Sequence, residues 1–153
     1  MRIKRAALLA GLILAVTGGA AVATHTSVGL TSTLLGRGTW SDDSARAFVK
    51  DLKAIKRWDS STVAVVRATL DAGGTTDWHG HPGPSVVVVT QGTIRVTEPT
   101  RNGGCRQTDY VANQAFVHDM SSHNFTNPGA TQAEFYVTYF APAGPLLSHA
   151  PAC

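Results

Sequence analysis

Short runs of β-branched and aromatic residues follow one another from Thr62 to the C-terminus, and clusters of turn-forming residues separate them. Runs of this length and composition are typical of β-strands. The expected strands are Thr62–Leu70, Ser85–Thr90, Thr93–Glu98, Cys105–Val111, Gln114–Val117 and Gln132–Phe140. Many short strands at close intervals indicate a β-sandwich or barrel, so the predicted fold class is all-β.

The last expected strand has two faces, because side chains alternate along a strand. Phe135, Val137 and Tyr139 share one face, and Tyr136, Thr138 and Phe140 share the other. Either set could line a barrel. We expect the first set to face inward, because its members are more uniformly bulky.

The N-terminal pattern is different and predicts export. A basic start, Met1–Arg5, precedes an uncharged apolar run that ends in Ala21-Val22-Ala23, as in a secretory signal peptide. We therefore expect residues 1–23 to be a signal peptide, 24–40 a flexible segment and 41–153 a single domain in a secreted protein. After cleavage no membrane attachment is expected.

Charge and cysteine content refine this picture. Without Arg2, Lys4 and Arg5 the chain has ten basic and ten acidic residues, so nothing in the charge points to nucleic acid as a partner. The chain has two cysteines, and an even count in an exported chain indicates a disulfide. We expect Cys105 to pair with Cys153.

Three histidines are candidates for a metal site. His79 and His81 are one residue apart before a β-branched run, so both imidazoles should point to the same side of an extended strand. His123 follows downstream. Together the three could bind a divalent ion (Fe, Mn, Ni, Cu or Zn) and leave coordination positions open for a ligand. The alternative is that they are structural residues held by hydrogen bonds.

The spacing of these histidines resembles the cupin superfamily. Gly73, His79, His81 and Gly92 are similar to its first motif, and His123 with Asn127 to the end of its second. Fuller strings, Asp77–Pro84, Tyr110–Phe116 and Pro151-Ala152-Cys153, resemble small secreted actinobacterial cupins. The resemblance implies a double-stranded β-helix, or jelly-roll barrel, and a metal bound by His79, His81 and His123. It also implies a small-molecule ligand and an association into homodimers.

The sequence departs from the cupin pattern at several positions, including His118 and Met120 in place of a Pro and a Gly of the second motif. Ser85 takes the place of the usual metal-binding Glu, and Asn113 takes that of a Gly whose positive φ an Asn can adopt. His118 could be a fourth ligand that replaces the missing acid, but we expect it to be a loop residue at the barrel mouth. Residues 41–58 could form a short helix, from their apolar spacing, or an irregular lead-in and a strand, from the resemblance.

Two functions fit these features. One is a metal-dependent enzyme, of the Fe(II) oxygenase type, that acts on a small organic substrate in the barrel. The alternative is a non-catalytic extracellular protein that binds a metal or a small ligand.

Arg95 could meet an anionic ligand or form a surface ion pair.

Overall fold

The computed structural model describes residues 27–39 and 62–153, and every regular element in these ranges is a β-strand. The order along the chain is β1 (Val28–Thr39), β2 (Thr62–Thr75), β3 (His79–Gly80), β4 (Ser85–Gln91), β5 (Thr93–Pro99), β6 (Cys105–Val111), β7 (Ala115–His118), β8 (Asn124–Thr126), β9 (Ala133–Ala141) and β10 (Ser148–His149). The all-β prediction is confirmed. In the part of the chain that is described, no helix is long and apolar enough to cross a membrane.

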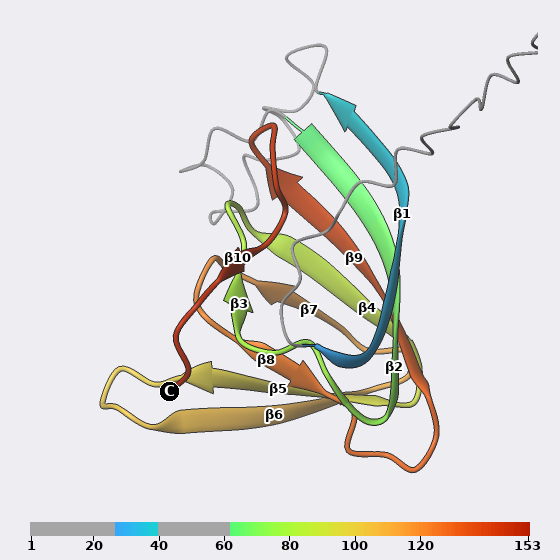
Figure 1. Ribbon diagram of the computed structural model, residues 1–153, viewed down its shortest axis with the longest axis vertical. Helices are drawn as coiled ribbons and strands as arrows, with labels where there is room; N and C mark the ends of the chain where they lie inside the picture. Colours follow the sequence, from blue (N-terminus) through green and yellow to red (C-terminus); the bar gives the residue numbers. More distant parts are fainter. Residues whose placement is uncertain (1–26, 40–61) are drawn as a thin grey trace, which may run out of the picture.

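Eight of these strands form one antiparallel sheet that curls into a nearly closed barrel (Figure 1). Its order is β6-β5-β8-β2-β9-β4-β7, and β1 is added along β2. The short strand β8 joins the two parts of the sheet, because Thr126 pairs with Thr75 of β2 and with Arg95 of β5. The remaining strands, β3 and β10, pair with each other.

Alternating side chains of β2, β4, β5 and β9 point into the barrel and form its core. On β9 the buried face carries Phe135, Val137 and Tyr139, as expected from their bulk. These side chains belong to one core cluster with residues of the other strands, namely Ala64, Ala68, Leu70, Val87, Val89, Ile94, Val96, Phe125 and Ala133. Burial of this apolar surface is the main stabilisation of the barrel.

Strand β1 corrects the expectation of a flexible segment at 24–40. Residues 28–39 are extended and pair with β2 from Val28 opposite Thr75 to Thr39 opposite Thr62. The Gly- and Thr-rich composition suggested a loop, whereas pairing with the long strand β2 makes this segment a strand. The predicted boundaries of the signal peptide and the two forms considered for 41–58 fall outside the described residues.

Two asparagines stabilise the chain where it turns between strands. Asn113 has a φ of 71°, which is the left-handed conformation expected for the residue in place of the motif's Gly. The buried side chain of Asn127 donates hydrogen bonds to the carbonyl oxygens of Leu70, Asp71 and Thr131. This side chain therefore links the end of β8 to β2 and to the segment just before β9.

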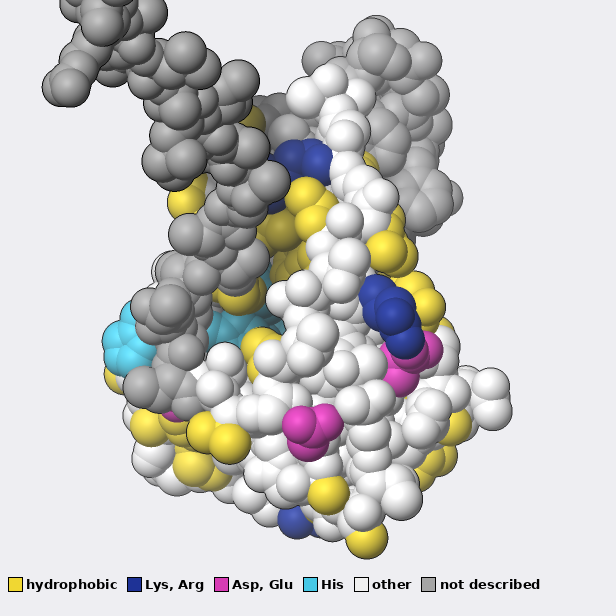
Figure 2. All heavy atoms as spheres, turned by 45° about the vertical axis from the view of Figure 1, so that its right-hand side comes forward, with side chains coloured by type: hydrophobic (Ala, Val, Ile, Leu, Met, Phe, Trp, Pro, Cys, Tyr) yellow, Lys and Arg dark blue, Asp and Glu magenta, His cyan; other side chains and the backbone are white. Residues whose placement is uncertain are grey.

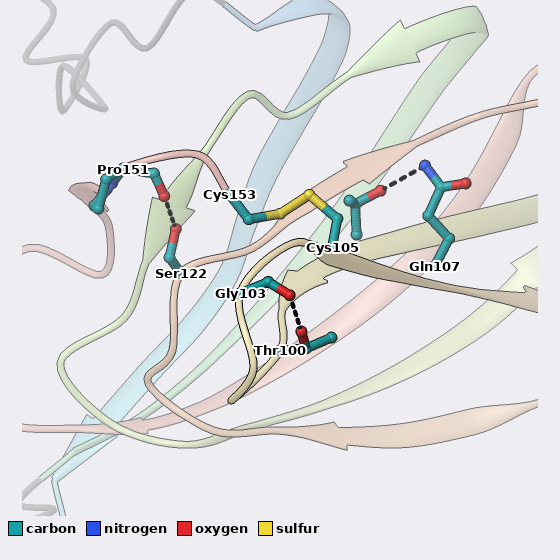
Figure 3. The surroundings of a disulfide bond; sticks show 8 residues. Thr100, Gly103, Cys105, Gln107, Ser122, Pro151 and Cys153 are labelled. Atoms are coloured by element: carbon teal, nitrogen blue, oxygen red, sulfur yellow. Dashed lines mark hydrogen bonds between the residues drawn. A yellow bond between two sulfur atoms is a disulfide. The ribbon is translucent and has the colours of Figure 1, made fainter.

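The disulfide between Cys105 and Cys153 is present, as expected (Figure 3). It fastens the last residue of the chain to the start of β6. Ser122 also donates a hydrogen bond to the carbonyl oxygen of Pro151 in the same tail. The C-terminal segment is thus held against the end of the barrel that carries the histidines.

Candidate metal centre

The backbone places His79 directly beside His123. The two residues form an isolated antiparallel bridge in which each N–H donates to the other's carbonyl oxygen at 2.9 Å. Strand β3 is only two residues long, so His81 follows it rather than lying within a longer strand as predicted. Both imidazoles nevertheless point into the same site.

Gly83 allows the chain to turn sharply between these histidines and β4. A Cβ atom at this position would lie 1.9 Å from the carbonyl oxygen of Phe140. The neighbouring Pro84 carbonyl accepts a hydrogen bond from the Phe140 N–H at 2.9 Å. The segment after His81 is therefore packed against β9, which explains why only Gly fits at position 83.

His79, His81 and His123 form one compact, buried group. One potential ligand atom from each lies within 4.8 Å of those of the other two. The ring centroids are 4.2 Å apart for His79 and His123 and 4.9 Å apart for each of the other two pairs. The structure therefore brings together all three histidines that the sequence singled out.

Each imidazole of this group is oriented through its Nδ1 atom. The partners are backbone carbonyl oxygens: Asp77 for His79 and Leu146 for His81, both at 2.8 Å, and Ser121 for His123 at 2.9 Å. A carbonyl only accepts, so Nδ1 carries the proton and Nε2 keeps its lone pair. The buried Nε2 of His123 has no hydrogen-bond partner among the described residues.

The surroundings keep the imidazoles of His81 and His123 neutral. Burial and, to a smaller extent, the nearby His79 lower the pKa of His81 to about 3. The pKa of His123 also lies well below its ordinary range, because of burial first and then of His79, His118 and His81. Neutral imidazole is the form that binds a metal, so the site is chemically ready for a cation.

Ser85 faces the site, as the motif spacing implies. It is buried, lines the same cavity as His79 and His81, and lies opposite Tyr139 of β9 and His118 of β7. Its Oγ has no hydrogen-bond partner among the described residues. The position of the usual acid is thus retained, but a hydroxyl occupies it.

His118 is buried on β7 rather than placed in a loop at the barrel mouth. Its ring centroid is 3.7 Å from that of His123, and its Nδ1 is 2.9 Å from the carbonyl oxygen of Asp119. Its Nε2 lies 3.6 Å from a carboxylate oxygen of Glu98. His118 is therefore a neighbour of the three-histidine group and lies outside its compact set of ligand atoms.

The structure also places Arg95, for which the sequence left two alternatives, and His149. Arg95 forms an exposed bidentate ion pair with Asp109 at 2.7 and 2.8 Å, so it is the surface pair and not an anion site. His149 received no role from the sequence, but it pairs with His79 between β10 and β3. Only the three-dimensional pairing could reveal this, because the two residues are far apart in sequence.

A cavity of about 860 Å³ lies inside the barrel and reaches His79 and His81. Its walls come mainly from β1, β2, β9 and the segment before β10, and most of its lining side chains are apolar. A volume of this size is typical of small-molecule sites. The fold and the site thus define a jelly-roll barrel of the cupin type, with three histidines that could hold a metal at the base of an apolar cavity.

Solved structures with the same fold support this class. An oxalate oxidase in complex with the substrate analogue glycolate is 21% identical, with a TM-score of 0.56, over 80% of this chain and 56% of that chain. Peruvianin-I, a cysteine peptidase from Thevetia peruviana latex, is 19% identical, with a TM-score of 0.56, over 82% and 69%. An oxalate decarboxylase from Lactobacillus farciminis, in a formate complex, is 18% identical, with a TM-score of 0.51, over 57% and 26%.

These likenesses establish the fold, and they span different activities. The present chain covers little more than half of the length of the oxalate oxidase chain. No protein-family model and no curated protein matches the sequence. Function therefore has to be argued from the site itself.

Proposed function

We propose that this protein is a secreted cupin that binds a divalent metal ion through the Nε2 atoms of His79, His81 and His123. The observation that carries the proposal is the buried Nε2 of His123, which has no hydrogen-bond partner among the described residues and lies in a group of three oriented imidazoles. A buried polar atom without a partner costs about 1–3 kcal/mol, and a bound cation would remove this cost. Fe, Mn, Ni, Cu and Zn all accept such ligands.

The first candidate activity is that of an Fe(II)-type oxygenase that acts on a small organic substrate. Three neutral ligands leave the ion its full charge and leave coordination positions open toward the cavity. When bound, a redox-active metal would supply Lewis acidity and dioxygen activation. The protein's own contribution would be to orient the imidazoles through the carbonyl oxygens of Asp77, Leu146 and Ser121 and to hold the substrate between apolar walls.

Oxalate, the compound named for two of the similar structures, fits this cavity poorly. Its two carboxylates carry no apolar group to contact the walls formed by Leu30, Val66, Phe135 and Val137. A substrate with an apolar body would bury more surface there. We therefore propose a substrate other than oxalate.

The second candidate is a non-catalytic protein that captures a metal or a small ligand outside the cell. One observation favours it: among the described residues that line the cavity there is no carboxylate, lysine or free thiol to act as a general base or nucleophile. Tyr139 lines the cavity as well, but burial raises the pKa of its hydroxyl well above the ordinary value. In an enzyme with this cavity, the metal would have to take the place of a general base or nucleophile.

Metal analysis of protein purified from its exported fraction tests the shared part of both candidates. We expect close to one equivalent of a transition metal for each chain. Dioxygen uptake by iron-loaded protein, screened with apolar organic acids and alcohols, then separates the two. Substrate-dependent uptake that is lost in His123→Ala supports the oxygenase, whereas metal binding without uptake supports the binding protein.

A further inference from the structure

The cavity has chemically distinct ends. Figure 2 shows a hollow lined by hydrophobic side chains, with histidine atoms at its lower end and basic side-chain atoms at its upper end. His79 and His81 line one part of this cavity, and Arg37 of β1 lines another. The walls between them are mainly apolar and include Leu30, Leu34, Val66, Ala68, Phe135, Val137, Leu146 and Leu147.

A β-bulge puts Arg37, which is exposed, on the side of β1 that lines the cavity. Leu34 lies opposite Val66, but the next paired residue is Gly36, opposite Val65, so Leu35 is the extra residue of β1. The bulge places Arg37 opposite Ala64, which is fully buried on the inward face of β2. In a regular strand Leu34 and Arg37 would face opposite sides, because they are an odd number of residues apart. Bulges often redirect a side chain next to a functional site.

The charge of Arg37 is not balanced inside the described part of the cavity. Its Nη1 donates a hydrogen bond to the neutral carbonyl oxygen of Gly144 at 2.9 Å. Across residues 27–39 and 62–153, no carboxylate lies within ion-pair distance of it, and no Asp or Glu lines the cavity. A guanidinium has five N–H donors, and its planar fork matches a carboxylate. The structure therefore offers donors for an anionic group beside apolar walls.

We propose that the ligand of this cavity is an organic carboxylate with an apolar body, and that Arg37 binds its carboxylate. The apolar body lies against Leu30, Val66 and Phe135, and the far end of the molecule faces the histidines. This inference deepens the proposed function and rests on it for the role of the histidine end. The contact with Arg37 does not depend on a metal, so it can be tested separately.

The test uses 2-naphthoate as the probe, 2-naphthamide as its neutral counterpart and acetate as a carboxylate without an apolar body. Calorimetric titration is carried out on the mature protein, both metal-free and loaded with Mn(II). We expect metal-free protein to bind 2-naphthoate at least about tenfold more tightly than either comparison compound, since a charge-assisted bidentate pair is stronger than a neutral hydrogen bond.

Three variants assign this preference to Arg37. Arg37→Gln should reduce the affinity for 2-naphthoate to that for 2-naphthamide, and Arg37→Lys should retain part of the preference. Arg101→Gln removes an exposed charge in the β5–β6 hairpin and should leave all affinities unchanged. Circular dichroism checks that each variant is folded, and the Lys variant keeps the test valid if the Gln variant is unstable.

The inference is overturned if wild-type protein binds 2-naphthoate and 2-naphthamide equally, if Arg37→Gln keeps the preference, or if neither compound binds. Its failure is distinguishable from that of the proposed function. The metal affinity of Arg37→Gln should equal that of the wild type. Absence of metal binding in the wild type and in Arg37→Gln would contradict the metal centre, and the measurements on metal-free protein would still decide the role of Arg37.

Discussion

Single residues decide the chemistry of the site. A carbonyl oxygen fixes the Nδ1 atom of each of the three histidines, so their direction comes from the backbone of the segments around them. Such outer contacts hold a ligand ring in place and fix its tautomer. The sequence could single out the histidines by their spacing. It could not show their carbonyl partners, because Leu146 is 65 residues away from His81.

Ser85→Glu should tighten metal binding. Position 85 is buried, faces the cavity and carries an unpartnered Oγ, so a carboxylate there would add an anionic ligand to three neutral ones. We expect an affinity gain of tenfold or more, which corresponds to about 1.4 kcal/mol. Calorimetric titration of the metal-free variant with Zn(II) or Mn(II) measures it.

His118→Ala is the matched comparison for this variant. His118 packs against His123 without belonging to the compact group, so its loss should weaken metal binding less than the loss of any of the three. A loss as large as that of His123→Ala would show that His118 is a fourth ligand. An unchanged affinity in Ser85→Glu would contradict the inward role of position 85.

At the scale of strands, the sequence predicted the longer elements, in which β-rich residues follow one another over several positions. The predicted strand Cys105–Val111 has the same bounds as β6, and four others differ from described strands by one residue at one or both ends. The strand predicted for Thr62–Leu70 begins where β2 begins, but β2 continues to Thr75. β8 and β10 were missed, since two or three residues carry no period, and β3 is shorter than the extended strand expected around His79 and His81. The place of the exposed Arg37 in the lining of the cavity was also hidden, because the bulge at Leu35 is set by pairing with β2.

The C-terminal segment links the disulfide to the histidines. Its β10 pairs with β3, which carries His79, and the carbonyl oxygen of Leu146 accepts a hydrogen bond from Nδ1 of His81. Cys105 and Cys153 hold the end of this segment. We therefore expect the disulfide to affect the site as well as the stability of the fold.

The variant Cys105→Ser/Cys153→Ser tests this link. A bridge across 48 residues should contribute about 4 kcal/mol in the chain-entropy model, so the melting temperature should fall clearly. Metal affinity should fall as well, because the tail that orients His81 is released. Thermal unfolding and metal titration measure the two effects. A variant with lower stability and unchanged metal affinity would show that the tail stays in place without the bridge.

At the scale of the whole molecule, the barrel was predictable and its N-terminal edge was not. The all-β class followed from the short β-rich runs, and the cupin-type barrel was implied by the resemblance of the motifs, whereas β1 was taken for a flexible segment because its Gly and Thr content is typical of loops. The cavity depends on this strand, since β1 supplies Leu30, Leu34 and Arg37. Association into homodimers stays a prediction.

Export is a property of the whole chain that the sequence alone predicts. The apolar run ending in Ala21-Val22-Ala23 should be removed, so the mature protein should begin at Thr24. N-terminal sequencing of protein from the culture medium measures this. A chain that begins at Met1 and remains with the membrane would contradict both secretion and the removal of residues 1–23 as a signal peptide.

The most direct test of the metal centre is calorimetric titration of metal-free mature protein with a divalent transition metal. Wild-type protein should bind one equivalent, and His79→Ala, His81→Ala and His123→Ala should each weaken binding by on the order of 100-fold, about 2.7 kcal/mol. The far-ultraviolet circular dichroism of the variants should be unchanged, because the barrel is held by its apolar core. Equal affinity in the wild type and all three variants would contradict the account and make these histidines structural residues.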